Sequence, residues 1–351
     1  MPLPSTRTDV AQDGGREFVD FLREHAGVLD DLMLVPYADE TTADLRRYLY
    51  DPLTRFTANA GKRVRPLICL LACHAVGGEP LAASSAACAI EHFQSAALIH
   101  DDIADEGQLR RGEPCMYLTE GVGVATNCGD LALSEVFGLV ANDTTLPEDI
   151  RLAVLAELFS MTHRTIEGQA LDLGWARDGR WDVSVDDYLS MAMLKTAHYS
   201  AAVPLAVGAT IGGGTSRQIE ALRSFGLKTG LAFQLQDDLL NLFGDAEGQG
   251  KDYRSDLTEG KRTLLVVWAL AHVSASEREE LVRLLSSHVT SSCELGRAAA
   301  IIQRSGAMEH VREYATTLAA EAKGLLHDLD LDATDASTLR SMADFFVTRT
   351  S

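Results

Sequence analysis

The sequence is short of basic residues. It has 31 Lys and Arg against 51 Asp and Glu in 351 residues, which gives a formal net charge of −20. A chain so acidic lacks the broad basic patch that nucleic acid or an anionic membrane surface requires. We therefore predict no nucleic-acid partner. If the substrate is itself an anion, metal ions and a few placed cations must reverse the field locally.

The sequence also lacks the marks of export, membrane insertion and disulfide bonding. Its start, MPLPSTRTDVAQDGG, has no basic end followed by an apolar stretch, and no run of about 18 uncharged apolar residues occurs later. The six cysteines form no CxxC motif and no paired framework, so we expect reduced, mostly buried thiols. These absences predict a cytoplasmic protein with no membrane span.

An alternating strand pattern is absent over any useful length. Apolar residues instead recur at three- and four-residue steps, and breaks such as GGEP (77–80) and GGGTS (212–216) separate the runs. The pattern predicts an all-α fold, a single bundle of about 12 helices. Residues 1–15 are predicted to be a loose N-terminal tail and residues 16–351 a single all-helical domain.

Two groups of aspartates each end an apolar helix. In SAALIHDDIADEG (95–107), Asp101 and Asp105 are four residues apart and share a helix face with Asp102 beside them. Such charges repel each other unless a cation lies between them, and Mg²⁺ binds one or two carboxylates together with phosphate oxygens. In FQLQDDLLNLFGD (233–245), Asp237 and Asp238 repeat the arrangement. One such cluster could be a solvated helix end, but two favour a metal–diphosphate site.

Basic residues that could bind diphosphate are few and clustered. Two groups lie in the segments GKRVRP (61–66) and RRG (110–112). A further lysine, Lys195, lies inside an apolar helix, and the others lie in GKDYRSDLTEGKRTL (250–264). Each alone could be a surface salt bridge; together, in an acidic chain, they favour phosphate binding. The candidates are Lys62, Arg65, Arg110, Arg111, Lys195, Lys251 and Lys261.

Seven segments occur in an order typical of one family: GKRVRP, HDDIAD, RRG, GQALDL (168–173), KT (195–196), FQLQDD and GKDYRSDLTEGKRTL. The chain thereby resembles the trans-isoprenyl diphosphate synthases, the polyprenyl synthetase family, from about Gly61 to Leu264. The resemblance implies the isoprenoid synthase fold around a central cavity and a homodimer. It also implies a prenyltransferase that condenses isopentenyl diphosphate with dimethylallyl, geranyl or farnesyl diphosphate and releases pyrophosphate.

The resemblance also implies roles for individual residues. Asp101, Asp102 and Asp105 would hold two Mg²⁺ ions on the allylic diphosphate, and Asp237 and Asp238 would hold a third. Basic groups at that diphosphate would be Arg110, Lys195, Lys251 and Lys261. Isopentenyl diphosphate would be bound by Lys62, Arg65, Gln94 and Arg111. Thr196 and Gln234 would stabilise positive charge at the reacting carbons. Two positions depart from the family pattern: Asn241 replaces a third Asp, and Arg254 replaces a Gly.

Small residues below the first aspartate cluster bear on product length. Ala97 is one turn below Asp101 and adjoins Ala96, so the growing tail is not blocked there. Phe93 lies about 12 Å below Asp101 at helical rise, and Phe137 could meet it as a floor, although core packing is an equal alternative for both rings. A floor at this depth suits geranylgeranyl diphosphate, while farnesyl and longer products stay open.

Two other functions share these features. A class I terpene cyclase has the same fold and an Asp-rich site, but it does not need the second anion site at Lys62, Arg65 and Arg111. A non-catalytic regulatory subunit of a synthase need not keep both aspartate clusters, and this chain keeps nearly all of both.

Overall fold

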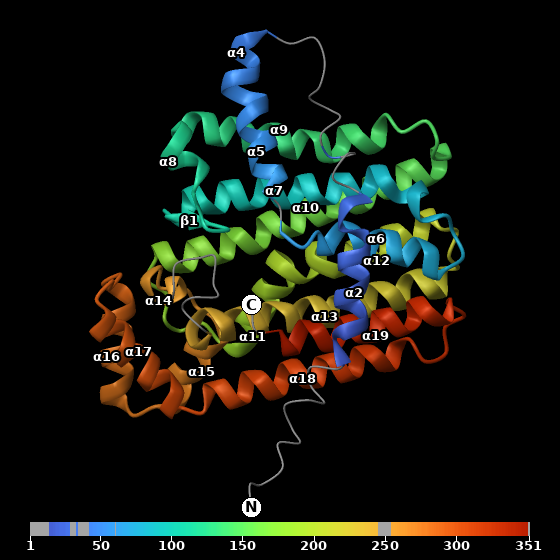
Figure 1. Cartoon of the computed structure of the whole chain (residues 1–351). Coiled ribbons are helices and arrows are strands. Elements are labelled where there is room, and N and C mark those ends of the chain that lie inside the picture. The colour runs from blue at the N-terminus through green and yellow to red at the C-terminus, as the bar shows by residue number, and fades with distance from the viewer. Residues whose placement is uncertain (1–13, 29–32, 34–41, 60, 245–253, 350–351) are drawn as a thin grey trace, which may run out of the picture.

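The computed structural model describes residues 14–28, 33, 42–59, 61–244 and 254–349, and these form a helical bundle (Figure 1). The all-α prediction is confirmed. The predicted tail, residues 1–15, lies outside the described residues except for its last two. The elements before the second aspartate cluster are α2 Arg16–His25, η1 Ala26–Val28, α4 Ala43–Leu45, η3 Arg46–Tyr50, α5 Asp51–Ala58, α6 Val64–Ala75, η4 Pro80–Ala83, α7 Ser84–Ala104, β1 Leu109–Arg110, β2 Glu113–Pro114, α8 Met116–Glu120, α9 Val122–Ala141, α10 Glu148–Arg177, α11 Val185–Ala192, η5 Met193–Ala202 and α12 Val203–Ile211.

The remaining helices are α13 Ser216–Phe243, α14 Ser255–Thr258, α15 Leu264–His272, α16 Ala275–Ser286, α17 Ser292–Arg304, α18 Ala307–Leu325 and α19 Ala333–Thr348. Helix α13 runs through the middle of the bundle, where it packs against η5 and α12 on one side and α18 and α19 on the other. Helix α7 packs against α6 and α9, and α10 packs against α9 and η5. Two buried apolar clusters meet along α13, one reaching α6 and α7 and the other reaching α15 to α18.

Two glycines bring η5 close to its neighbours. A Cβ on Gly168 of α10 would lie 2.3 Å from the backbone nitrogen of Lys195, and one on Gly230 of α13 would lie 2.7 Å from the carbonyl oxygen of Ala197. Neither distance leaves room for a side chain. The π-helical segment η5 is therefore held between α10 and α13, and it presents Lys195 and Thr196 to the space between them.

The structure adds a small hairpin where the sequence predicted no strands. Strands β1 and β2 pair antiparallel, with Arg110 opposite Glu113. The two residues between them, Arg111 and Gly112, both have positive φ, at 56° and 81°. Two such residues form the tight turn whose twist matches a hairpin. Strands of two residues are too short to show alternation in sequence.

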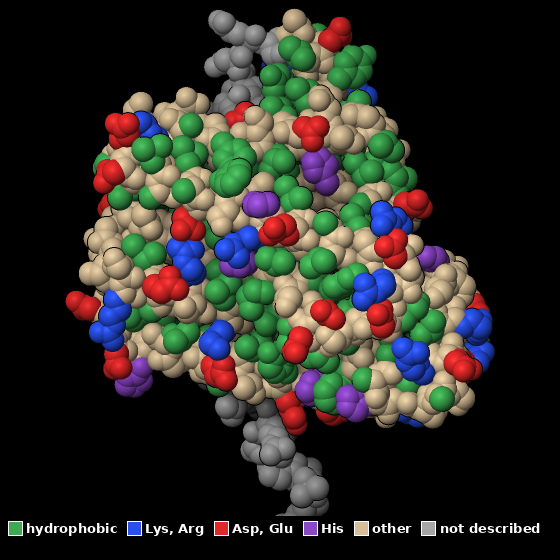
Figure 2. All heavy atoms as spheres, turned by 180° about the vertical axis from the view of Figure 1, so that it is seen from behind, with side chains coloured by type: hydrophobic (Ala, Val, Ile, Leu, Met, Phe, Trp, Pro, Cys, Tyr) green, Lys and Arg blue, Asp and Glu red, His purple; other side chains and the backbone are tan. Residues whose placement is uncertain are grey.

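Helix α9 is long and apolar enough to cross a membrane by length and composition alone. It packs against α7 and α10 in the bundle and carries Asp130 and Glu135. None of the six cysteines is in a disulfide, and all but Cys293 are buried. On the face shown in Figure 2, Lys and Arg side chains are scattered among Asp and Glu and form no broad basic area.

Candidate active site

A cavity of about 750 Å³ lies between α7, α10, η5 and α13. It brings together most of the residues predicted from the sequence. Those that line it are Arg65, Phe93, Gln94, Ala96, Ala97, Asp101, Asp102, Asp105, Arg110, Arg111, Lys195, Thr196, Gln234, Asp237, Asp238 and Lys261. Lys62 and Phe137 are described but do not line it. Lys251 lies outside the described residues.

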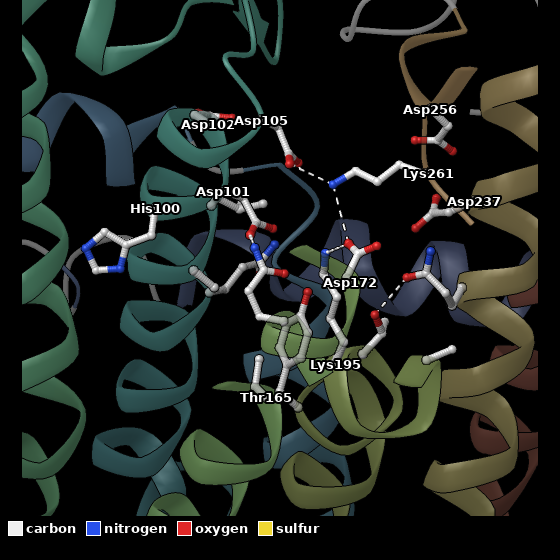
Figure 3. Close-up of a pocket in the computed structure, with 18 of the residues that line it drawn as sticks. His100, Asp101, Asp102, Asp105, Thr165, Asp172, Lys195, Asp237, Asp256 and Lys261 are labelled. Carbon is white, nitrogen blue, oxygen red and sulfur yellow. Dashed lines mark hydrogen bonds and ion pairs between the residues drawn. The ribbon is translucent and has the colours of Figure 1, made fainter. Parts of the chain in front are cut away.

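The first aspartate cluster forms the last turn of α7, and its members differ in surroundings. Asp101 accepts a hydrogen bond of 2.6 Å from Nε2 of Gln169 on α10. Asp102 is buried, and its Oδ1 accepts from Nε of Arg110 at 2.8 Å and also from Nη2 of the same residue. Burial raises the pKa of the Asp102 carboxyl, against the opposing effect of Arg110. Asp101 and Asp105 are more exposed and point into the cavity (Figure 3).

The second aspartate cluster lies across the cavity on α13 (Figure 3). Asp238 is buried and accepts hydrogen bonds from Tyr188 Oη at 2.6 Å and Gln234 Nε2 at 2.8 Å. Burial raises the pKa of Asp238 to about 7, although both hydrogen bonds lower it. Asp237 forms an ion pair with Arg349, whose guanidinium also stacks 4.1 Å from the centre of the Phe233 ring.

Asn241, which replaces a third aspartate, holds the neighbouring segment in place. Its amide donates to Ser255 Oγ at 3.0 Å and accepts from the backbone N–H of Asp256 at 3.2 Å. Asp256 thereby lines the cavity beside Asp237 (Figure 3). Arg254, the other departure, has a φ of 61°, which is the conformation that glycine adopts most easily. The loop therefore keeps the glycine-like backbone at that position.

Between the two clusters, Asp172 of α10 binds both lysines of the site. Its Oδ2 is 2.6 Å from Lys195 Nζ and 3.4 Å from Lys261 Nζ. Lys261 also contacts Asp105 Oδ1 at 2.7 Å (Figure 3). Burial would raise the pKa of Asp172, but the two ammonium groups outweigh it and lower the pKa to about 2. The same contacts raise the pKa of Lys195 and Lys261 against the effect of burial.

The remaining predicted residues have hydrogen-bond or ring contacts of their own. Arg65 donates to Tyr199 Oη at 3.2 Å and to Ser200 Oγ at 2.9 Å. Arg111 donates to the carbonyl oxygen of Asn59 at 2.8 Å. Lys62 is exposed, with its Nζ 5.7 Å from the centre of the Phe345 ring near the chain's last helix. Thr196 Oγ1 donates to Gln234 Oε1 at 2.8 Å.

Among the cavity residues that sequence reasoning missed are Gln169, Asp172, Tyr188, Asp256 and Arg349. Asp172 had a usable signal, because a lysine inside an apolar helix needs a buried counter-ion and GQALDL (168–173) supplies the acid. Arg349 gave no comparable signal, since it lies 112 residues from Asp237 in the chain.

The donor groups of the cavity suit a divalent cation that prefers oxygen ligands. Within the described ranges, no three Asp, Glu, His or Cys side chains converge on one point. Mg²⁺ does not need such a cage, because it keeps waters and binds through one or two carboxylates plus substrate phosphates. The side-chain oxygen of Gln169 is buried beside Asp101 without a hydrogen-bond partner, so one further acceptor is in place. The residues fit Mg²⁺ bound together with a diphosphate.

Comparison with known proteins agrees with this geometry. The polyprenyl synthetase family model matches residues 46–303. The chain belongs to the polyprenyl synthetase family. It is 36% identical over 334 residues to the short chain isoprenyl diphosphate synthase of Methanothermobacter thermautotrophicus, covering 95% of this chain and 99% of that one. It is 35% identical over 319 residues to the geranylfarnesyl diphosphate synthase of Natronomonas pharaonis, covering 86% and 88%.

Solved structures of this family share the fold. The geranylgeranyl pyrophosphate synthetase of Pyrococcus horikoshii superposes with a TM-score of 0.86 at 30% identity, over 95% of this chain and 99% of that one. The geranylgeranyl pyrophosphate synthase of Corynebacterium glutamicum, complexed with isoprenyl diphosphate and magnesium, superposes with a TM-score of 0.81 at 29% identity, over 97% and 98%.

Proposed function

We propose that this protein condenses isopentenyl diphosphate with an allylic diphosphate, which lengthens the prenyl chain by one isoprene unit and releases pyrophosphate. One observation carries the proposal. Asp101 and Asp105 on α7 face Asp237 on α13 across one cavity, and Lys195 and Lys261 lie between them. Carboxylates and ammonium groups so mixed can bind an anion and its metal ions together. The named relatives are elongating synthases, which supports the same reaction.

We propose Mg²⁺ as the cofactor. Asp101, Asp102 and Asp105 would hold two ions, and Asp237 and Asp238 a third. Bound there, the ions supply Lewis-acid stabilisation of the departing diphosphate. The magnesium complex of the Corynebacterium glutamicum synthase supports this assignment. Asp102 is buried and accepts a hydrogen bond from Arg110, so Asp101 and Asp105 are the carboxylates more accessible to a metal ion.

The cations of the site divide into two groups. Lys195 and Lys261 lie between the aspartate clusters and would bind the allylic diphosphate, with Arg110 and with Lys251, a residue that the resemblance alone assigns. Arg65 and Arg111 lie on α6 and the hairpin, and with Gln94 and Lys62 they would bind isopentenyl diphosphate. Two separate anion sites are what a condensing enzyme needs.

The reaction breaks the allylic carbon–oxygen bond and forms a carbon–carbon bond to the double bond of isopentenyl diphosphate. The new carbon–carbon bond leaves a cation on the former isopentenyl unit, and the released pyrophosphate takes up the proton whose loss forms the new double bond. Lys195 and Lys261 stabilise the charge that develops on the leaving oxygen. Thr196 Oγ1 and Gln234 Oε1 are oxygens in the cavity wall that can stabilise the allylic cation. The apolar walls at Ala96 and Ala97 exclude water, which would quench that cation.

We propose geranylgeranyl diphosphate as the main product, made by a homodimeric cytoplasmic enzyme. Ala96 and Ala97 line the cavity and leave it open past the first turn, and Phe93 lines it farther down. Two large apolar side chains on α10, Leu152 and Phe159, are more than half exposed at seven-residue spacing, which supports a helix-to-helix dimer contact.

Purified protein with Mg²⁺, labelled isopentenyl diphosphate and each of three primers (dimethylallyl, geranyl and farnesyl diphosphate) provides the test. Chromatography is expected to give elongated prenyl diphosphates, with Asp101→Ala as the inactive control. Cyclic hydrocarbon formed from geranylgeranyl diphosphate without isopentenyl diphosphate would instead identify a terpene cyclase. No pyrophosphate release from any primer would identify a regulatory subunit.

A further inference from the structure

The loop that carries Lys261 is fixed by a buried arginine. Arg262, the next residue, is only 3% exposed and lines the cavity. Its Nη1 donates to the carbonyl oxygen of Gly260 at 2.6 Å, and its Nε donates to the carbonyl oxygen of Arg180 at 2.8 Å. The side chain therefore joins the turn before α15 to the connection between α10 and α11, which lies 82 residues earlier in the chain.

The ring of Trp181 holds the guanidinium plane of Arg262. The guanidinium carbon lies 3.8 Å from the centre of the ring, a distance at which arginine stacks on an aromatic face. Helix α16 holds Trp181 in turn. The ring Nε1 donates to Ser286 Oγ at 3.0 Å, and Arg278 Nη2 donates to the Trp181 carbonyl oxygen at 3.2 Å. Arg262 is thus bound at its edge by two carbonyls and at its face by an anchored ring.

The position of Arg262 requires a planar group and not only a positive charge. Burial lowers the pKa of Arg262, against the opposing effect of Asp172, so the charge is held there at a cost. Both hydrogen bonds described above go to neutral carbonyl oxygens. A guanidinium can bond to two carbonyls and stack on a ring at once, because its donors lie in one rigid plane. The ammonium group of a lysine has no such plane.

The turn that Arg262 holds determines where Lys261 points. Gly260, whose carbonyl oxygen accepts from Arg262, directly precedes Lys261 and has a φ of 66°. From this turn the Lys261 Nζ reaches Asp105 on α7 at 2.7 Å and Asp172 on α10 at 3.4 Å (Figure 3). Because the backbone on both sides of Lys261 is fixed by one side chain, loss of that side chain would let the ammonium group shift from both carboxylates.

We propose that Trp181 and Arg262 are positioning residues, which act through Lys261 to place its ammonium group for the allylic diphosphate. The proposal rests on the proposed function, which assigns Lys261 to that diphosphate, and deepens it. Arg65 and Arg111, which are assigned to isopentenyl diphosphate, form their hydrogen bonds with other segments of the chain. The effect of the stacked pair is therefore expected on one substrate and not on the other.

The Michaelis constants of the two substrates test the proposal, measured with the primer that the wild type elongates fastest. Arg262→Lys keeps the charge without the planar fork, and Trp181→Leu removes the ring. In both, KM for the primer is expected to rise about 10-fold, the value of one charge-assisted hydrogen bond. KM for isopentenyl diphosphate is expected to stay at the wild-type value. Trp181→Phe, which keeps an aromatic face, is expected to restore most of the primer KM.

Two control variants separate positioning from packing. Arg180→Gln changes an exposed side chain paired with Asp182 and leaves the carbonyl oxygen that serves Arg262. Trp268→Leu removes a half-buried indole that packs against the same apolar cluster as Trp181. Both controls are expected to leave the two KM values unchanged, whatever their effect on the melting temperature.

A double variant shows whether the stacked pair acts through Lys261. Equilibrium binding of labelled primer with Mg²⁺ measures affinity without turnover. Lys261→Ala is expected to weaken primer binding, and adding Trp181→Leu to it is expected to weaken binding no further. A further loss in the double variant would overturn the proposal, because the ring would then act by another route.

A wild-type primer KM in folded Trp181→Leu or Arg262→Lys would also overturn the proposal, as would an equal rise in both KM values. Melting curves show whether each variant folds. If Trp181→Leu does not fold, Ser286→Ala, which removes only the hydrogen bond to the ring, is measured in its place with the same expectation. A wild-type protein that elongates no primer overturns the proposed function instead, so the two failures are distinguishable.

Discussion

Asp172 connects two lysines that no short stretch of sequence brings together. Lys195 is 23 residues away in the chain and Lys261 is 89 residues away, yet both contact its Oδ2. The three groups form a largely buried network in which both lysines share Asp172, and Lys261 also contacts Asp105. Asp172 therefore positions both cations for an incoming diphosphate.

Replacing Asp172 with Asn is expected to lower stability and turnover together. The two ammonium groups would lose their shared counter-ion, and breaking a buried ion pair on one side costs about 3 kcal/mol. Turnover is expected to fall about 100-fold, the range for loss of a charge-positioning group. Thermal melting and pyrophosphate release measure the two effects. Asp178→Asn is the matched control, because Asp178 forms an exposed pair with Arg177 at the end of the same helix.

The burial of His92 predicts a loss of folding stability at low pH. Its side chain is fully buried on α7, and burial, aided by Arg63, lowers its pKa to about 4. In the unfolded chain the ordinary value is about 6.5. Between these values the unfolded state binds a proton that the folded state does not, so stability is lost as the pH falls from 6.5 toward 4.

His92 contributes about 3 kcal/mol to this loss of unfolding free energy at low pH. His92→Gln removes the titrating group, so the slope of unfolding free energy against pH is expected to flatten in that window. Denaturant unfolding at several pH values measures the slope. The exposed His327 is the control, and His327→Gln should leave the slope as it is. Equal slopes for His92→Gln and the wild type would contradict the assignment.

At the scale of helices, the approach of α10 to η5 sets the distance between Asp172 and Lys195. Gly168→Ala is expected to push the helices apart, because its Cβ would lie 2.3 Å from the Lys195 backbone nitrogen and 2.6 Å from its Cα. Overpacking of this kind costs about 1–3 kcal/mol, and activity should fall with it. Melting temperature and turnover measure both.

Gly174→Ala on the same helix provides the control. A Cβ there meets nothing within 4 Å, so the substitution is expected to stabilise the helix by up to about 1 kcal/mol. If Gly168→Ala behaves like Gly174→Ala, the close approach is not needed for activity.

The presence of the helices and their approximate bounds could be predicted from apolar periodicity, because most of the helices bury one face. Apolar periodicity over 216–243 corresponds to α13, Ser216–Phe243, and periodicity over 124–141 lies within α9, Val122–Ala141. The π-helical turns of η5, which lie against Gly168 and Gly230, were not predictable, because their apolar spacing does not differ visibly from that of an α-helix. The hairpin at Arg110–Glu113 depends on positive φ angles that sequence periodicity does not encode.

The candidate site was predictable where charge appears in an apolar helix and not where it depends on tertiary contact. Asp101, Lys195 and Asp237 stand out for that reason, and all three line the cavity. Tyr188, whose Oη donates to Asp238, looked like an ordinary core residue. Phe137 was predicted either to form the floor with Phe93 or to pack in the core; it lies one turn beyond the lining residue Leu133 on α9 and packs against the core cluster.

At the scale of the whole molecule, α10 presents an uncovered apolar face. Leu152 and Phe159 are 60% and 64% exposed and lie on one side of the helix. Burying such a face against the same face of a second copy is the symmetric solution typical of homodimers. The network at Asp172 lies on the same helix, so assembly and activity are expected to be coupled.

Phe159→Asp is expected to convert a dimer into a monomer, because it places a charge in the middle of this face. Sedimentation velocity of the purified protein measures the change. Leu81→Asp is the control, since Leu81 is 53% exposed on η4 and is not part of the α10 face, and it should leave the dimer intact. A wild-type protein that sediments as a monomer would contradict the proposed homodimer.

Arg349, bound to Asp237, comes two residues before the carboxyl end of the chain. Its carbonyl oxygen also accepts from Gln236 Nε2 at 2.8 Å, so the backbone itself is tethered at the rim of the cavity. The end of α19 is therefore attached to the second aspartate cluster at two points, so a change that shifts α19 is expected to displace Asp237 as well.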